Sequence, residues 1–431
     1  MAPDVVLRVQ AGTTAGPQGR IGTVTTTPQS SRTIDVAALR AHFPQLADRT
    51  AYFDGPGGTQ TPDVVADAVR DALLAPLSNR GSATLAARNA DAVVRAAREA
   101  MGDLLGVPPS TVVFGRSSTE LTFSLARSLS RGWGPGDEVV VTRLDHDANI
   151  RPWTVAAGAV GATVRWAPFD PQTGELAPAD VAALLSDRTR VVAVTGASNL
   201  LGTRPDLPAI AAAAHAVGAL VHVDGVHLAA HAPVDVAATG ADTFVCSPYK
   251  FLGPHCGVLT GRADLLQQLR PDKLLPSSDE VPERFELGTL PYELLAGTTA
   301  AVDLIAGLAP EAETHGTRRQ RLVAGMTAVE HHEDRLRLRL ESGLLDLGLT
   351  VRSRAGHRTP TLLCTSPHRT AVELVDALAT AGVNASAGHF YALEASRWLG
   401  LGDEGGLRIG VAPYTDDADV DRLLGALAAA L

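Results

Sequence analysis

Apolar positions in the middle of the chain alternate between short runs and helical patterns. Residues 189–195 (TRVVAVT), 219–224 (ALVHVD) and 243–246 (TFVC) are short and rich in β-branched side chains, which predicts buried strands. The Ala-rich segment 208–217 has the composition of a helix. Strand, helix and strand in this order form right-handed crossover units. From about residue 34 to 310 the alternation predicts a large α/β domain with a mostly parallel central sheet.

The pattern changes after residue 310. A long charged amphipathic segment, 311–345, precedes candidates for a strand, a helix, two strands and a final helix. Thr415 is expected to cap the final helix, whose first turn is acidic. Residues 311–431 are therefore expected to form a smaller C-terminal α+β domain, against which the first residues of the large domain can pack. Residues 1–33 are polar and aperiodic, and we expect a flexible tail.

Charge and composition exclude several classes of function. The chain has 37 basic and 47 acidic residues and a net charge of −10, so it lacks the basic surface that nucleic acid or an anionic membrane requires. No apolar run approaches the roughly 18 residues of a spanning helix, and the first residues lack the apolar region of a signal peptide. We therefore expect a soluble cytoplasmic protein with neither nucleic-acid nor membrane partners.

Cysteine and lysine are both scarce. Cys246, Cys256 and Cys364 are too few for a disulfide framework and lack the CxxC spacing of a zinc site, so no metal is expected. Only Lys250 and Lys273 are lysines among the 37 basic residues. The simplest interpretation of the excess of arginine is a GC-rich coding bias.

Polar side chains follow each predicted strand in the middle of the chain. They are Asn199 after the first strand, Asp224 and His227 after the second, and Ser247, Tyr249 and Lys250 after the third. The carboxyl ends of parallel strands meet at one edge of a sheet. An amide, a carboxylate, an imidazole and one of only two lysines are therefore expected to converge there.

A desolvated lysine at this edge suits an imine with an aldehyde cofactor, for which pyridoxal phosphate is the obvious candidate. Asp224 can keep the ring nitrogen protonated, and His146 in LDHDAN can cover the ring. Ser118 and Thr119 open a predicted helix whose N–H groups suit a phosphate. Taken singly, each residue has a structural explanation, such as a surface lysine, a turn acid or an ordinary helix start. Their order and shared edge favour a site.

Eight segments carry a resemblance to a known family. They are YFDGPGGTQTP (52–62), RSSTE (116–120), DHDANIRPW (145–153), SNLLGT (198–203), HVDGVH (222–227), SPYKFLGPHCG (247–257), RFELGT (284–289) and LRIGVAPYT (407–415). In order and spacing, from about residue 40 to the end, this set resembles class V aminotransferases of the cysteine desulfurase type. These are fold-type I pyridoxal phosphate enzymes.

The resemblance implies a role for each matched position. Lys250 would form the imine with pyridoxal phosphate, Asp224 would pair with the pyridine nitrogen and His146 would stack on the ring. The other expected cofactor contacts are Ser118, Thr119, Ser247 and Tyr249 at the phosphate, Asn199 and His227 near the 3-oxygen, and Thr289 at the phosphate of the neighbouring subunit in a homodimer with shared active sites. The resemblance also implies that Gly57 and Arg408 bind the substrate, with Arg408 binding the carboxylate of an amino acid.

One segment departs from the family pattern. Desulfurases of this type have a segment resembling R-x-G-H-H-C, whose cysteine attacks the substrate sulfur. Residues 386–396 (SAGHFYALEAS) stand in its place, with Tyr391 at the cysteine position and Phe390 at the second histidine. Persulfide chemistry by that route is not expected. Phe390 and Tyr391 are expected to line a pocket for a bulky side chain, and His389 is either a second acid–base candidate or structural.

Without the thiol, proton loss or decarboxylation at the substrate Cα remains available. We expect a carbon–sulfur β-lyase that acts on a cysteine S-conjugate in specialised metabolism, with Lys250 as the base. A decarboxylation-dependent deaminase, an aminotransferase and an epimerase are alternatives on the same fold. A non-catalytic homologue that binds the cofactor is a further alternative. A nicotinamide enzyme is disfavoured because no GxGxxG follows the first predicted strand.

Overall fold

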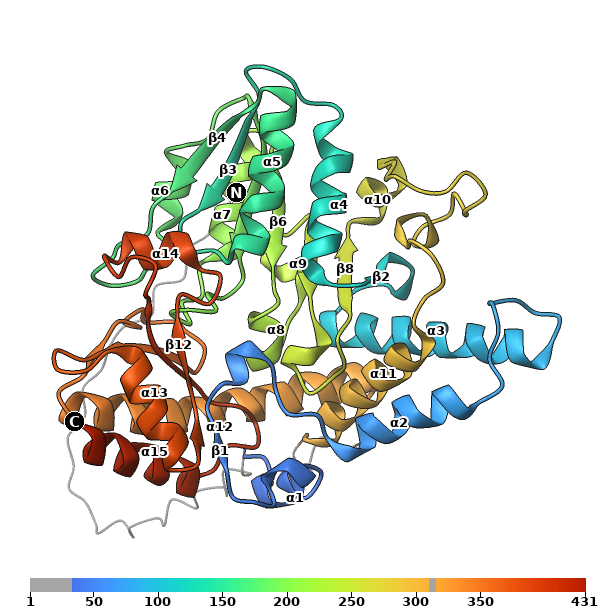
Figure 1. Ribbon diagram of the computed structural model, residues 1–431. Helices are drawn as coiled ribbons and strands as arrows, with labels where there is room; N and C mark the ends of the chain where they lie inside the picture. The colour runs from blue at the N-terminus through green and yellow to red at the C-terminus, as the bar shows by residue number, and fades with distance from the viewer. Residues whose placement is uncertain (1–32, 310–314) are drawn as a thin grey trace, which may run out of the picture. The chain divides into compact units, whose positions relative to one another are not determined.

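The computed structural model describes residues 33–309 and 315–431. A seven-stranded sheet forms its centre (Figure 1). In spatial order the strands are β2 (Val113–Gly115), β8 (Gly257–Gly261), β7 (Thr243–Cys246), β6 (Leu220–Asp224), β5 (Thr189–Thr195), β3 (Glu138–Thr142) and β4 (Thr163–Ala167). Only the pairings of β8 with β2 and β7 are antiparallel; the other paired strands are parallel. The expected α/β fold with a mostly parallel sheet is confirmed.

The three predicted central strands occur within one residue of their expected bounds. In the register of β5 and β6, Thr195 lies opposite Asp224, so these strands end level at the same edge. The helix between them, α7 (Leu207–Ala216), begins one residue before the predicted start. Its first turn is fixed by Asp206, which accepts a hydrogen bond from the Ala209 N–H at 3.1 Å.

Helices surround the sheet and connect it to the C-terminal part of the chain. Helices α2 (Asp63–Leu74) and α3 (Leu85–Leu105) both pack against α11 (Tyr292–Gly307) (Figure 1). Helix α12 (Arg318–Asp346) continues from α11 to the second sheet. Its Leu322, Met326 and Val329 lie in the core of the large sheet, whereas its Leu336, Leu340 and Leu344 lie in a second core. None of the helices in the described part of the chain is long and apolar enough to cross a membrane.

The C-terminal part is built on a four-stranded antiparallel sheet. Its strands, in spatial order, are β12 (Ser386–Gly388), β13 (Gly406–Gly410), β10 (Thr361–Thr365) and β9 (Thr350–Val351). Near it, β1 (Ala51–Tyr52) pairs with β11 (Val383–Asn384), so an early segment packs with the C-terminal core. The helices of this part are α13 (Ala371–Thr380), α14 (Leu393–Trp398) and α15 (Asp417–Ala430). The division into domains at 34–310 and 311–431 stays a prediction, and the tail predicted for 1–33 lies almost wholly outside the described residues.

The expected N-cap of the last helix was wrong by one residue. Asp416 caps α15 and accepts a hydrogen bond from the Asp419 N–H at 2.9 Å, while the Asp419 carboxylate accepts one from the Asp416 N–H at 3.2 Å. This reciprocal pair satisfies two backbone donors at once. Thr415 instead accepts a hydrogen bond from the Ala412 N–H at 3.0 Å.

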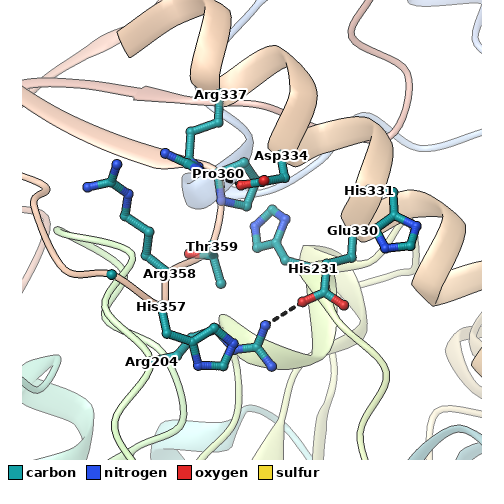
Figure 2. A pocket seen from close by; sticks show the side chains of 11 residues that line it. Arg204, His231, Glu330, His331, Asp334, Arg337, His357, Arg358, Thr359 and Pro360 are labelled. Atoms are coloured by element: carbon teal, nitrogen blue, oxygen red, sulfur yellow. Dashed lines mark hydrogen bonds and ion pairs between the residues drawn. The ribbon is translucent and has the colours of Figure 1, made fainter.

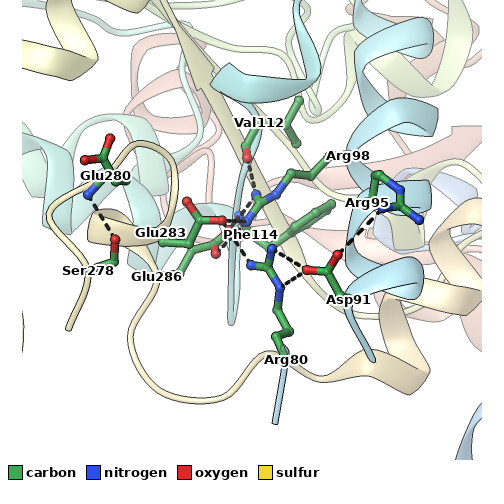
Figure 3. Close-up of polar contacts among 10 residues, drawn as sticks. All are labelled: Arg80, Asp91, Arg95, Arg98, Val112, Phe114, Ser278, Glu280, Glu283 and Glu286. Carbon is green, nitrogen blue, oxygen red and sulfur yellow. Dashed lines mark hydrogen bonds and ion pairs between the residues drawn. The ribbon is translucent and has the colours of Figure 1, made fainter. Parts of the chain in front are cut away.

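A buried ion pair fixes the strand that leads to helix α4 (Ser118–Ser130). Both Arg98 terminal nitrogens donate to the Glu286 carboxylate at 2.8 Å, and Glu286 also accepts from the Phe114 N–H of β2 at 2.9 Å (Figure 3). The side chains of Arg98 and Glu286 are 8% and 4% exposed. At the rim of the same network, Glu283 pairs with Arg80 and is 32% exposed. The ion pair therefore joins α3, β2 and the segment before Thr289.

Replacing Glu286 by alanine is expected to lower the free energy of unfolding by about 3–5 kcal/mol, because it removes the bidentate partner of the buried Arg98 and leaves only the Val112 carbonyl and a 3.5 Å contact with Glu283. The matched control is Glu283→Ala at the exposed rim, which should cost no more than about 1 kcal/mol. Urea unfolding of the two variants measures the difference. Equal losses in both variants would contradict the assigned role of Glu286.

Candidate active site

Most of the expected cofactor residues line one cavity at the carboxyl edge of the large sheet. The members of this set are Ser118, Thr119, His146, Asn199, Asp224, His227, Tyr249 and Lys250. They come from the segments after β2, β3, β5, β6 and β7. Ser247 lies directly beside them, and its hydroxyl is 3.1 Å from that of Ser118. The structure thus brings together residues that are up to 132 positions apart, from Ser118 to Lys250.

The start of helix α4 lies against the sheet beside this cavity. Ser117 caps the helix by accepting a hydrogen bond from the Glu120 N–H at 3.1 Å, so the helix begins at Ser118. A side chain at Gly257 of β8 would place its Cβ only 2.2 Å from the Ser117 carbonyl carbon, so this close approach requires glycine. The first-turn N–H groups of a helix favour an anion.

Lys250 follows β7 in a single 3₁₀ turn (Pro248–Lys250) and is deeply buried at its amine end. Its Nζ donates a hydrogen bond to the carbonyl oxygen of Pro56. Burial lowers the pKa of Lys250 to about 7; the Arg408 charge lowers it further, whereas Asp224 opposes the shift. Near neutral pH a large fraction of this amine is therefore uncharged, which is the form that attacks an aldehyde.

Asp224 and His146 present a carboxylate and a neutral ring to the cavity. Asp224 ends β6 and accepts a hydrogen bond from the Val226 N–H at 2.9 Å; burial raises its pKa to about 6, so it is mostly ionised at pH 7. Burial, reinforced by Lys250, lowers the pKa of His146 to about 4. The Nδ1 of His146 accepts the Ala148 N–H at 3.0 Å, which places the ring proton on Nε2.

Two buried polar atoms in this cavity have no hydrogen-bond partner among the described residues. They are Oδ1 of Asn199 and Nδ1 of His227. The other ring nitrogen of His227, Nε2, lies 2.9 Å from the Thr361 hydroxyl and 3.0 Å from the Thr359 hydroxyl. Buried polar groups are ordinarily paired, so these two atoms indicate a polar ligand in the cavity.

A second cavity of about 550 Å³ continues outward from the first. It shares Thr119, His146, Tyr249 and Lys250 and adds the expected substrate residues Gly57, Phe390, Tyr391 and Arg408. The Arg408 guanidinium lies 3.7 Å from the centre of the Phe390 ring and donates to the Asn199 carbonyl at 3.0 Å. Burial lowers its pKa to about 9, a shift that Asp54 opposes. Arg408 therefore presents a positive charge at neutral pH.

Besides Ser247, two of the expected site residues do not line these cavities. Thr289 is exposed and lines a separate cavity that also includes Leu287, so its contact with a second subunit stays a prediction. His389 accepts a hydrogen bond from the Tyr391 N–H at 3.2 Å, and its catalytic role also stays a prediction.

The segment that differs from the family pattern closes over the cavity in an unusual conformation. Phe390 and Tyr391 have φ angles of 53° and 59°, a left-handed region that bulky residues seldom adopt. Asn199 donates to the Phe390 carbonyl at 2.9 Å, and the Asp147 N–H donates to that of Tyr391 at 2.7 Å. The Tyr391 ring centre is 5.5 Å from that of His146. All three cysteines are buried, and none lines either cavity.

Several residues of the site had no signal in the sequence. Phe123 and Arg151 line the outer cavity. Thr361 at the start of β10 and Thr359 just before it form hydrogen bonds with His227. Asp145 lies fully buried behind the site and accepts the Asn149 side-chain amide at 2.6 Å. Asp145 alone has a neighbour that points to it, because it directly precedes His146.

The comparison with known proteins agrees with this geometry. Residues 51–423 match the family model described as Aminotransferase class-V. The chain is 35% identical over 399 residues to the uncharacterized protein MT3887 of Mycobacterium tuberculosis, covering 91% of this chain and 98% of that protein. It is 31% identical over 410 residues to a cysteine desulfurase of Dickeya dadantii, covering 90% and 95%. The crystal structure of the cysteine desulfurase CsdA from Escherichia coli superposes with a TM-score of 0.81 at 28% identity, covering 92% and 98%.

The inner cavity fits the cofactor of this family, pyridoxal phosphate. The amine of Lys250 is buried and its pKa is about 7, so it can react with an aldehyde near neutral pH. Asp224 places a carboxylate in the cavity, and the unpartnered atoms of Asn199 and His227 can bind a polar ligand. Ser118 and Thr119 lie at the start of a helix, where a phosphate is favoured. The chain therefore belongs to the class V aminotransferase family of pyridoxal phosphate-dependent enzymes.

Proposed function

We propose that this enzyme is a carbon–sulfur β-lyase of specialised metabolism that acts on a cysteine S-conjugate. The proposal rests on the outer cavity. Phe390 and Tyr391 line it at the place where persulfide formation would need a thiol nucleophile. The cavity retains a base, Lys250, and a cation for a carboxylate, Arg408. A substrate with its own leaving group on Cβ needs no further nucleophile.

The chain's residues would divide the elimination between them. Arg408 would hold the substrate carboxylate by charge-assisted hydrogen bonds. When bound, pyridoxal phosphate supplies the electron sink that acidifies the Cα–H bond. The Lys250 amine would take the Cα proton on Nζ, and the Cβ–S bond would break with its electron pair leaving on sulfur. The thiolate would then take this proton from Nζ, and water would hydrolyse the unsaturated amino acid to pyruvate and ammonia.

Three features of the inner cavity would hold the cofactor. Asp224 would pair with the ring nitrogen, and the flat neutral ring of His146 would cover one face. Asn199 and His227 would satisfy their unpartnered atoms on the 3-oxygen side. Ser118, Thr119, Ser247 and Tyr249 would surround the phosphate, with Thr289 contributing from a neighbouring subunit of a homodimer.

Three free cysteines are consistent with a cytoplasmic location.

Product analysis tests the proposal. Incubation of the purified holoenzyme with S-benzyl-L-cysteine is expected to release benzyl thiol, pyruvate and ammonia in equal amounts. Transfer of the amino group to a keto acid would instead identify an aminotransferase, release of CO₂ a decarboxylating deaminase, and formation of the D-isomer an epimerase. Persulfide on the protein during turnover of L-cysteine would contradict the proposal directly.

A further inference from the structure

A second charged cavity lies behind His227, between helix α12 and the segment that joins β9 to β10. Its volume is about 360 Å³. Its polar lining comes from Arg204, His231, Glu330, His331, Asp334, Arg337, His357, Arg358 and Thr359. Figure 2 shows the His231 ring in the middle of the cavity, with Asp334 on one side and the Arg204–Glu330 pair on the other.

Two residues that line this rear cavity contact His227, which lines the cofactor cavity. His231 ends helix α8 (Leu228–His231), and its ring meets that of His227 edge-on, with 4.7 Å between the centres. The Thr359 hydroxyl, which lines the rear cavity, lies 3.0 Å from Nε2 of His227. Nδ1 of His227 faces no partner among the described residues and belongs to the cofactor side. A ligand in the rear cavity would therefore touch two groups that contact His227, His231 and Thr359, while Thr361 holds the same ring from outside the cavity lining.

The polar groups of the rear cavity are only partly used by the protein. His231 engages the fully buried Glu333 through Nδ1 at 2.9 Å, and its other nitrogen has no hydrogen bond to a described residue. Arg204 uses Nη1 for Glu330. The Arg358 side chain is 9% exposed, and its buried Nε has no partner within 33–309 or 315–431. Donors and acceptors thus remain for a bound molecule.

The charges around the rear cavity select the class of ligand. Three arginines, at 204, 337 and 358, are paired with the carboxylates of Glu330, Asp334 and Glu341, the last of which bonds both Arg337 and Arg358, and the buried Glu333 carboxylate is paired with His231. A dianion or a cation would upset this balance and leave buried charge unpaired. A molecule with one positive and one negative group preserves it and meets complementary charges at both ends.

We propose that the rear cavity is a second binding site for a zwitterionic α-amino acid, with its carboxylate toward Arg204 and His231 and its ammonium toward Asp334. Occupancy shifts His231 and Thr359 and so changes the position of His227 against the cofactor. The enzyme then senses an amino acid that it does not transform at that site. This inference does not depend on which bond the active site cleaves.

Calorimetric titration of the full-length holoenzyme with 2-aminoisobutyrate, a zwitterion without a Cα hydrogen, tests the site. Two binding events are expected. Arg408→Gln should weaken the active-site event alone, and Asp334→Asn should weaken the other by at least about tenfold, since a charge-assisted hydrogen bond is lost. Asp334 is 49% exposed, so this substitution spares the fold. Asp264→Asn, an exposed carboxylate outside the cavity, is the matched control.

A second readout follows the cofactor. In the Arg408→Gln holoenzyme, binding at the rear cavity is expected to shift the absorbance of bound pyridoxal phosphate, and the shift should vanish in the double variant with Asp334→Asn. A single binding event that Asp334→Asn leaves unchanged would overturn the site. If acetate or inorganic phosphate binds there as tightly as the amino acid, the assignment of a zwitterionic ligand is wrong. Binding without a spectral shift would overturn the coupling to His227.

Discussion

Replacing Lys250 by alanine is expected to lower turnover by about 10²–10⁴-fold or more, the usual contribution of a positioned proton-transfer group. The cofactor should also lose its covalent attachment, so that borohydride treatment no longer fixes pyridoxyl mass to the protein. Both readouts depend on the same amine, the only lysine side chain that lines the two active-site cavities. Steady-state rates and mass spectrometry of the reduced protein measure them.

The natural control is Lys273→Ala, because the sequence has no third lysine. The Lys273 amine donates to the Ser277 carbonyl at 2.9 Å and pairs with Asp279, and it lines neither active-site cavity. That variant should keep full turnover and full labelling. In the unsubstituted protein, uptake of pyridoxal phosphate should rise with pH, reach half its maximum near pH 7 and level off above that as the Lys250 amine loses its proton. Labelling that survives in Lys250→Ala would refute the assignment.

Replacing Arg408 by glutamine is expected to lower kcat/KM by about 30-fold or more, chiefly through KM. Loss of one partner of a buried charged contact costs about 2 kcal/mol or more, and about 1.4 kcal/mol corresponds to tenfold. The pKa of Lys250 should rise at the same time, because the Arg408 charge now lowers it. The pH at which cofactor uptake reaches half its maximum should therefore move upward.

Arg151→Gln supplies the control for Arg408. Arg151 lines the same outer cavity, but it is 46% exposed and already paired with Asp147 at 2.8 Å. Its loss should change kcat/KM only slightly and should leave the pH midpoint in place. If the two variants behave alike, Arg408 is not the group that holds the substrate carboxylate.

The central strands and the residues after them could be predicted from the sequence because both depend on local pattern. Buried parallel strands are continuous apolar runs, and their carboxyl ends must share an edge. Asp224 and Lys250 could therefore be placed in one cavity before any geometry was known. The error at Thr415 has a local cause too: two adjacent residues could both cap the helix, and the reciprocal bond with Asp419 favours Asp416.

Contacts between distant segments left no local signal. Thr359 and Thr361 reach His227 across more than 130 residues, and nothing in their own neighbourhood indicates it. The left-handed backbone at Phe390 and Tyr391 was equally hidden, since the favoured residue for such a conformation is glycine. Hydrogen bonds from Asn199 and Asp147 hold that conformation, and they exist only once the chain has folded.

Helix α12 has a mechanical consequence for the active site. Its 29 residues span about 43 Å and belong to both hydrophobic cores. The turn that carries Lys250 rests on the first core, and strand β13, which carries Arg408, rests on the second. Rotation of the C-terminal sheet about this common axis would alter the separation of the amine and the guanidinium. The separation of the proposed base and the proposed carboxylate anchor thus depends on how α12 holds the two cores together.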